Sequence, residues 1–87
     1  MRAVVTVVGK DKTGIIARVS GVLYENNVNI LDISQTIMQD LFTMIMLVDM
    51  PSSTVKDMTE KLDAAAKEIG VSIHLQNEEL FSSMHRI

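Results

Sequence analysis

Two segments of this chain carry apolar residues at both of their alternating sets of positions, and this pattern constrains the fold most strongly. Arg2–Val8 has valines in both sets before Gly9 ends the run, and Leu41–Met50 is almost wholly apolar. A strand with one face in water needs polar side chains at every second position, whereas a strand covered on both faces does not. We therefore expect both segments to be central strands of a covered sheet.

The remaining periodicity predicts two helices and two further strands. In chain order these are a helix over Gly14–Glu25, a strand over Val28–Met38, a helix over Val55–Ile69 and a strand over Val71–Gln76. Gln39 and Asp40, between the second and third strands, are a candidate two-residue hairpin turn.

The order βαββαβ predicts an α+β domain of the ferredoxin-like kind, a four-stranded antiparallel sheet with two helices on one face. This topology puts the first and third strands in the centre, and these are the two doubly apolar segments. We expect one domain over residues 1–87, with 76–87 as a C-terminal helical extension that Asn77 caps. A chain this short buries roughly 60–65% of its unfolded surface, so association is a natural remedy for its thin core.

The helix ends have recognisable signals. Thr13 or Asp11 can cap the first helix, and Ser53 or Thr54 the second, by accepting hydrogen bonds from free backbone N–H groups. Asn26-Asn27 and Gly70 suit the two C-terminal ends because these residue types tolerate a left-handed backbone. Inside the first helix, Gly21 is expected to allow close packing against the sheet.

The second face of the sheet is predicted to be too apolar to remain in water, so the C-terminal helix or another chain must cover it. Met44 and Met46 are hypothesised to face a partner chain. Which alternating set of the second strand points inward stays open, because Gln35 lies on the more apolar set and suggests a bulge or an interface.

Composition excludes several classes of function. The net charge is −3 and no Lys/Arg cluster stands out, which argues against a nucleic-acid partner. The chain has no cysteine, and its two histidines, His74 and His85, lack metal-ligand spacing, so we expect no metal and no cofactor. Neither a signal-peptide pattern nor an apolar run of membrane-spanning length is present, so a cytoplasmic location without membrane contact is expected. No catalytic constellation is visible.

Two short polar loops hold the candidate site residues. The first runs from Val8 to Gly14 and the second from Asn26 to Ile30. We expect the two loops to meet at one sheet edge, where free amides of a helix start, a carboxylate and an asparagine could hold a small zwitterion such as an amino acid. The alternative is that Asp11 and Thr13 only cap the helix and Asn29 only completes a turn.

The residues Lys10-Asp11-Lys12-Thr13-Gly14-Ile15-Ile16, Val28-Asn29-Ile30 and Asp32-Ile33-Ser34-Gln35 resemble the ACT domain. The chain is similar, more narrowly, to small ACT proteins related to the glycine cleavage repressor and to the N-terminal part of formyltetrahydrofolate deformylases. The resemblance covers nearly the whole chain.

This resemblance implies a regulatory module that binds amino acids or other small molecules. It also implies a homodimer that joins two sheets side by side into eight strands, with ligands at the seam. By that resemblance Asp11, Thr13, Gly14 and Ile15 would form the first loop's contact, and Asn29 and Ile30 the other wall, possibly from the partner subunit.

The sequence thus favours a cytoplasmic homodimer that senses a small molecule, an amino acid first among the candidates, and acts on a separate, unidentified protein. The alternative is an interaction module without a ligand. An enzyme is not expected.

Overall fold

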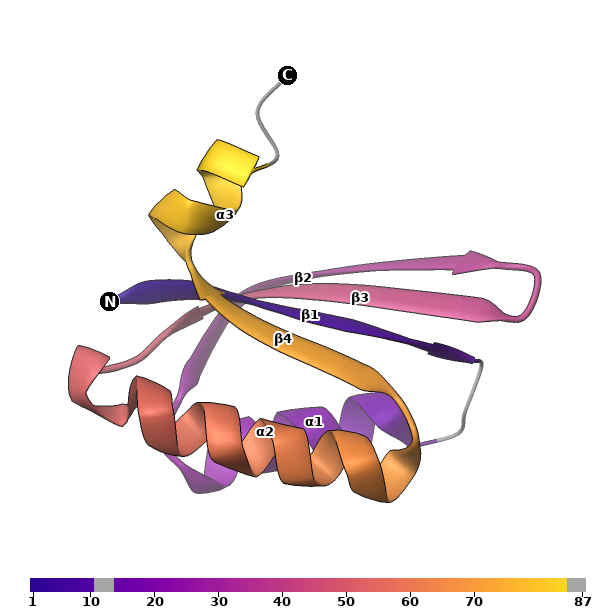
Figure 1. The fold of residues 1–87 in the computed structure, drawn as a ribbon, viewed down its shortest axis with the longest axis horizontal. Coiled ribbons are helices and arrows are strands. Elements are labelled where there is room, and N and C mark those ends of the chain that lie inside the picture. Colours follow the sequence, from indigo (N-terminus) through magenta and orange to yellow (C-terminus); the bar gives the residue numbers. More distant parts are fainter. Residues whose placement is uncertain (11–13, 85–87) are drawn as a thin grey trace.

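The computed structural model describes residues 1–10 and 14–84 (Figure 1). Its elements are β1 (Arg2–Lys10), α1 (Ile15–Glu25), β2 (Asn29–Met38), β3 (Leu41–Asp49), a short 3₁₀ turn at Ser52–Thr54, α2 (Val55–Ile69), β4 (Ser72–Asn77) and α3 (Glu78–Met84). The predicted order is confirmed, and the ends of β1 to β4, α1 and α2 differ from the predicted ones by at most two residues. Asn77 closes β4, and α3 follows it directly.

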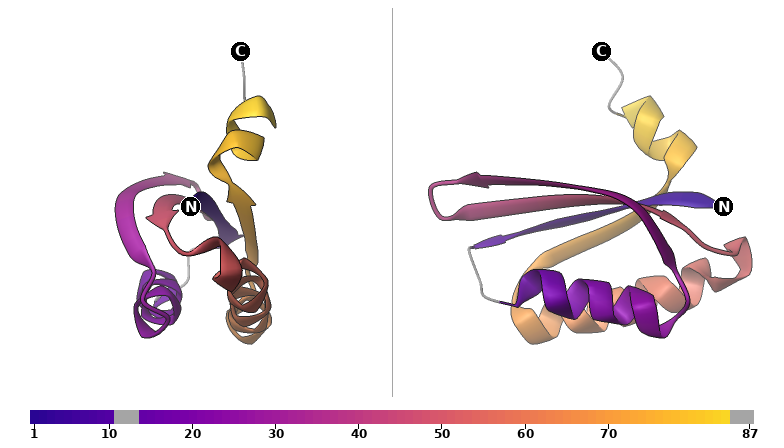
Figure 2. Two further views of the ribbon diagram at one scale, coloured as in Figure 1. Left: turned by 90° about the vertical axis from the view of Figure 1, so that its left-hand side faces the viewer. Right: turned by 180° about the vertical axis from the view of Figure 1, so that it is seen from behind.

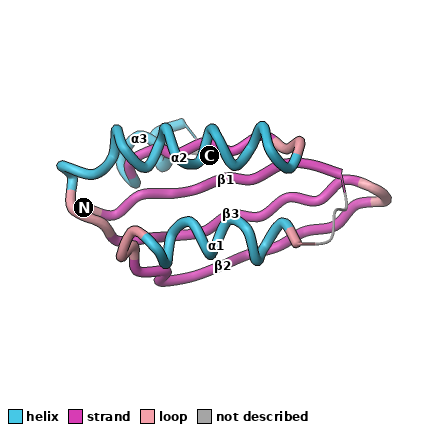
Figure 3. The backbone as a smooth tube through the Cα atoms, turned by 90° about the horizontal axis from the view of Figure 1, so that it is seen from below, coloured by secondary structure: helices cyan, strands magenta, loops and turns pink. Residues whose placement is uncertain are grey.

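The strands form one antiparallel sheet in the order β2-β3-β1-β4, which confirms that the two doubly apolar strands are central. Helices α1 and α2 lie side by side on one face of this sheet, α1 near β2 and β3 and α2 near β1 and β4 (Figures 2 and 3). We call this the inner face. The shorter α3 stands on the opposite, outer face and packs on β1 and β4 (Figure 1).

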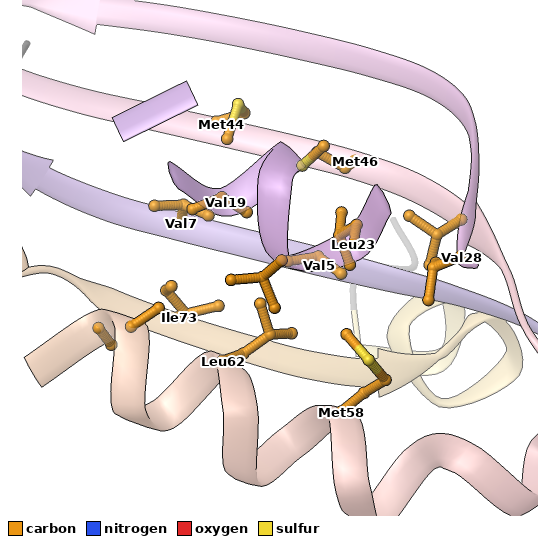
Figure 4. Close-up of a cluster of buried hydrophobic side chains, with 14 of the residues drawn as sticks. Val5, Val7, Val19, Leu23, Val28, Met44, Met46, Met58, Leu62 and Ile73 are labelled. Atoms are coloured by element: carbon orange, nitrogen blue, oxygen red, sulfur yellow. The ribbon is translucent and has the colours of Figure 1, made fainter. Parts of the chain in front are cut away.

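The core lies between the inner face and the two helices (Figure 4). Val5 and Val7 of β1 are fully buried, and so are Leu23 of α1 and Leu62 of α2. Burying an aliphatic side chain of this size stabilises a fold by about 1.5–3 kcal/mol.

Met44 and Met46 lie in this core with no exposed surface, so the hypothesis that they face a partner chain is wrong. The alternation of β3 places them on the helix-covered face, and Ile45 between them on the outer face. Met58 of α2 is buried with them (Figure 4).

A bulge at Leu31 determines which side chains of β2 lie on the inner face of the sheet. Ile30 pairs with Val48 and Asp32 with Leu47, so Leu31 is the extra residue and every later side chain changes face relative to a regular strand. Ile33, Gln35 and Ile37 therefore share the inner face with Ile30. The β2–β3 hairpin turns at Gln39, which has φ 53°, and extends beyond the helices (Figure 1).

The helix ends match the predictions in part. Asn27 and Gly70 adopt the expected left-handed backbone, with φ 60° and 71°. The predicted cap of α2 is wrong, because the Thr54 hydroxyl donates to the Pro51 carbonyl (2.7 Å) and no side chain caps that helix. Gly21 does not pack against the sheet, since a Cβ built there would meet no atom within 4 Å.

Candidate functional site

The end of β1 that leads into the first loop is held against the start of β4. A Cβ at Gly9 would lie 2.5 Å from Val71 Cγ1, closer than side-chain atoms approach one another. Only glycine allows this approach without a shift of the neighbour. The direction in which the chain leaves the sheet toward the candidate site is therefore set by this contact.

The structure describes two of the four predicted first-loop residues. Gly14 is exposed and has φ 90°, a backbone conformation that favours glycine, and α1 begins directly after it. Ile15 is almost fully buried, so its side chain serves the core and only its backbone N–H is placed at the helix start. Asp11 and Thr13, with the predicted cap of α1, lie outside the described residues.

Asn29 and Ile30 begin β2 at the far end of α1. Asn29 is exposed and pairs with Asp49, which pairs with Arg2, whereas the first loop leaves the sheet where Lys10 pairs with Leu41. The 11 residues of α1 separate the two ends by roughly 16 Å at about 1.5 Å per residue. The prediction that the two loops meet within one chain is therefore wrong, because a full helix lies between Gly14 and Asn29.

The flank of α1 that points away from α2 carries a partly exposed apolar surface. Ile16, Ser20 and Tyr24 follow one another at a spacing of four on α1. They lie on the flank opposite Arg18 and Asn26, which bond to α2, so this flank points away from α2. Ile16 is 40% and Tyr24 82% exposed.

The same side of the molecule continues onto β2, the edge strand next to α1 (Figure 3). Leu31, Ile33 and Ile37 are all exposed there. We call the set Ile16, Ser20, Tyr24, Leu31, Ile33 and Ile37 the seam surface. Sequence reasoning missed its α1 part, although the spacing of Ile16, Ser20 and Tyr24 was visible beside the core stripe.

One backbone N–H group of the edge strand β2 already has a hydrogen-bond partner. The Ile33 N–H donates to the Asp32 carboxylate (2.9 Å), a local bond between neighbours in the strand. Edge strands of ten residues with exposed aliphatic side chains are templates for pairing with another strand. A second strand that paired with β2 would have to displace this local hydrogen bond at Ile33.

A groove between α1 and α2 on the solvent side is a weaker candidate. It has a volume near 340 Å³ and is lined by Arg18 and Lys61, among other residues. Arg18 pairs with Glu68 (2.7 Å) and Lys61 with Asp57 (3.0 Å), so both cations are already compensated by exposed carboxylates. An anionic ligand would have to displace these pairs.

The described residues contain neither a metal-binding cluster nor a membrane-spanning helix. In residues 1–10 and 14–84, no three His, Asp or Glu side chains gather closely enough to hold a metal ion. The helices in that part of the chain are also too short or too polar to cross a membrane.

Comparisons of the sequence and of the fold with known proteins agree on one protein family. The family model described as ACT domain matches residues 2–76. The UPF0237 protein of Clostridium acetobutylicum is 55% identical over 89 residues, covering 100% of both chains. An ACT domain protein from Streptococcus pneumoniae has a TM-score of 0.83 and 39% identity over 93% of each chain.

Two larger proteins share the fold at lower identity. A putative glycine cleavage system transcriptional repressor has a TM-score of 0.78 and 23% identity, covering 86% of this chain and 44% of that one. A formyltetrahydrofolate deformylase from Pseudomonas putida KT2440 has a TM-score of 0.79 and 13% identity, covering 87% of this chain and 28% of that one. These are the two groups named by the sequence resemblance.

Proposed function

Because the chain belongs to the ACT domain family, we propose that it is a regulatory module in which two copies bind a small molecule, an amino acid, between them. The module is non-catalytic and acts on a separate protein in the cytoplasm. Each binding site uses the first loop of one copy and Asn29 with Ile30 of the other.

The observation that carries this proposal is the seam surface beside a long edge strand. If β2 pairs antiparallel with its copy around a twofold axis, the two α1 helices also run antiparallel and Ser20 lies near the axis. The N-terminal end of one α1 then lies beside the C-terminal end of the other. Gly14 of one copy comes next to Asn29 of its partner, so the geometry that fails within one chain is satisfied twice in a dimer.

The chemistry at this junction suits a zwitterion. The first N–H groups of α1 have no partner inside the helix, and together with the positive end of the helix dipole they favour a carboxylate. The Asn29 amide can donate and accept, and the Asp11 carboxylate can pair with an ammonium group. An amino acid presents both charges a few ångströms apart, which matches such a split site.

A ligand at the junction would regulate by acting on the dimer. A small molecule that contacts two copies binds the dimer better than the separate protomer, so it shifts the population toward the dimer by that difference in affinity. A protein that recognises the dimer would then respond to ligand concentration, and by linkage it would raise the ligand's affinity in return.

Isothermal titration against each of the common amino acids tests the proposal. We expect one to bind to the wild-type protein, Asn29→Ala to lose most of the heat, and Asn77→Ala to keep it. Asn77 is the matched control because it ends β4 at the opposite edge of the sheet. No heat and no thermal stabilisation with any amino acid at millimolar concentration would refute an amino-acid site.

The exposed seam surface alone would also serve a pure association module without a ligand. In that case Asp11→Ala and Asn29→Ala change only local stability, by about 1 kcal/mol for a lost cap or turn contact. A loss of ligand response in Asn29→Ala with unchanged melting temperature would exclude this second function.

A further inference from the structure

The outer face of the sheet has an unusual composition for a surface in water. Ser34, Ile45, Thr6 and His74 form one row across the four strands, and Thr36, Thr43, Val8 and Ser72 form the next. Neither row contains an Asp, Glu, Lys or Arg side chain. The third row consists of Met38, Leu41 and the exposed Lys10, and Met38 and Leu41 are 63% and 44% exposed.

Helix α3 covers only one end of this face. It packs on β1 and β4, and Val4 beneath that end is almost fully buried. Beside it lies a hollow of about 350 Å³ lined by Thr6, Ile45, His74, Gln76 and Phe81. The end of the face toward the hairpin stays open, and Ile45 is still 37% exposed (Figure 1).

We propose that a second copy of this chain packs on the outer face, around a twofold axis that lies along the row Thr36–Thr43–Val8–Ser72. Such an axis exchanges the two ends of the face. The hairpin end of each copy, with Leu41, comes over the row that contains Ile45 and the hollow of the other. The hairpin end thus meets the end with the hollow twice, as a self-complementary contact requires.

The size of the outer face and the distribution of charge on it both favour a second copy of this chain as the partner that covers it. At about 4.8 Å between strands and 3.4 Å per residue, the face from Leu47 to Leu41 spans roughly 20 by 20 Å, about 400 Å² in projection. The corrugation of the side chains and the flank of α3 raise this toward the ~600 Å² per partner at the lower limit of specific interfaces. The two central rows carry no acidic or basic side chain, whereas Asp32 lies beside Leu47 and Lys10 beside Leu41 at the margins of the face. Two copies with a net charge of −3 repel, and these central rows are where they approach at least cost.

This contact is independent of the seam surface, because the seam lies at the β2 edge and on α1, whereas the outer face lies behind the sheet (Figure 2). With both contacts made, the wild-type protein assembles into multiples of the seam dimer. If the seam contact does not form, the outer face alone gives a dimer.

Light scattering after size-exclusion chromatography of Ile45→Asp tests the outer-face contact. We expect the mass to fall to half that of the wild type in a dilution series, since a buried carboxylate would face an apolar partner. Ala64→Asp is the matched control, because Ala64 is exposed on α2, and it should keep the wild-type mass. Melting curves check that Ile45→Asp is folded. An unchanged mass in folded Ile45→Asp, or a monomeric wild type, would overturn the proposal.

Cross-linking tests the position of the axis. The chain has no native cysteine, so Thr43→Cys introduces one thiol next to the proposed axis. A short bismaleimide should couple two copies of Thr43→Cys efficiently and leave Ser53→Cys, on the turn before α2, uncoupled. Equal coupling in both variants would refute the arrangement. Failure of the amino-acid titrations would leave these two results unaffected.

Discussion

The contact between Gly9 and Val71 makes a quantitative prediction about the strand that carries the first loop. In Gly9→Ala the new methyl group would stand 2.5 Å from Val71 Cγ1 and 3.1 Å from Val71 Cβ. Overpacking of this kind costs about 1–3 kcal/mol, because both strands must shift. Replacing glycine inside a strand returns roughly 0.5–1 kcal/mol of backbone entropy, so from the middle of both ranges we expect a net loss of about 1 kcal/mol.

A double-mutant cycle separates this clash from other effects. Val71→Ala removes Cγ1, so Gly9→Ala should cost clearly less in that background, with a coupling of about 1 kcal/mol. Urea unfolding gives the free energies, and a loss of 1 kcal/mol should lower the melting temperature by about 4–8 °C in a domain of this size. A neutral Gly9→Ala, or additive effects of the two substitutions, would refute the packing argument.

Three further predictions follow from the described residues. Gly21→Ala should stabilise the protein by about 0.5–1 kcal/mol in urea unfolding, because the new Cβ meets no atom and the helix gains propensity; a destabilised variant would mean that α1 packs more closely there. Leu62→Ala should cost about 2–5 kcal/mol by the same measurement, since Leu62 is 1% exposed in the middle of the core, and a loss below 1 kcal/mol would contradict that packing. Ile33→Pro should leave the protomer folded but prevent seam pairing, because proline is tolerated on an edge strand yet cannot donate to a new neighbour. Its sedimentation should show the seam dimer lost, and an unchanged mass would place the seam elsewhere.

The fold could be predicted because several independent patterns agreed. The order of periodicities determines βαββαβ, and the two doubly apolar segments independently select β1 and β3 as the central strands. Asn27 and Gly70 were predictable for the same reason, since a left-handed residue after a helix restricts the residue types that fit.

The failures have physical causes as well. Thr54 was predicted to accept from the helix start, but its hydroxyl reaches the Pro51 carbonyl in the preceding turn, and sequence spacing does not distinguish these bonds. The facing of β2 depends on a bulge at Leu31. Gln35 suggested a bulge or an interface in this strand, but no residue type marked the position of the bulge. The side of β3 on which Met44 and Met46 lie could not be read from a strand that is apolar on both faces.

The separation of Gly14 from Asn29 was, in contrast, available from the sequence. A helix of 11 residues keeps its ends roughly 16 Å apart, whatever the sheet beneath it does. Counting that length would have favoured, among the expectations from the sequence, the arrangement in which Asn29 and Ile30 come from the partner subunit.

The central claim is that each ligand is shared between the first loop of one copy and Asn29 of its partner, and mixing two defective variants tests it directly. Asp11→Ala and Asn29→Ala should each fail to bind the amino acid that the wild type binds. In a heterodimer of the two, one junction carries both substitutions and the other carries neither. After subunit exchange, calorimetry should therefore find one restored site in each heterodimer. A mixture that binds no better than its separate components would contradict the shared site.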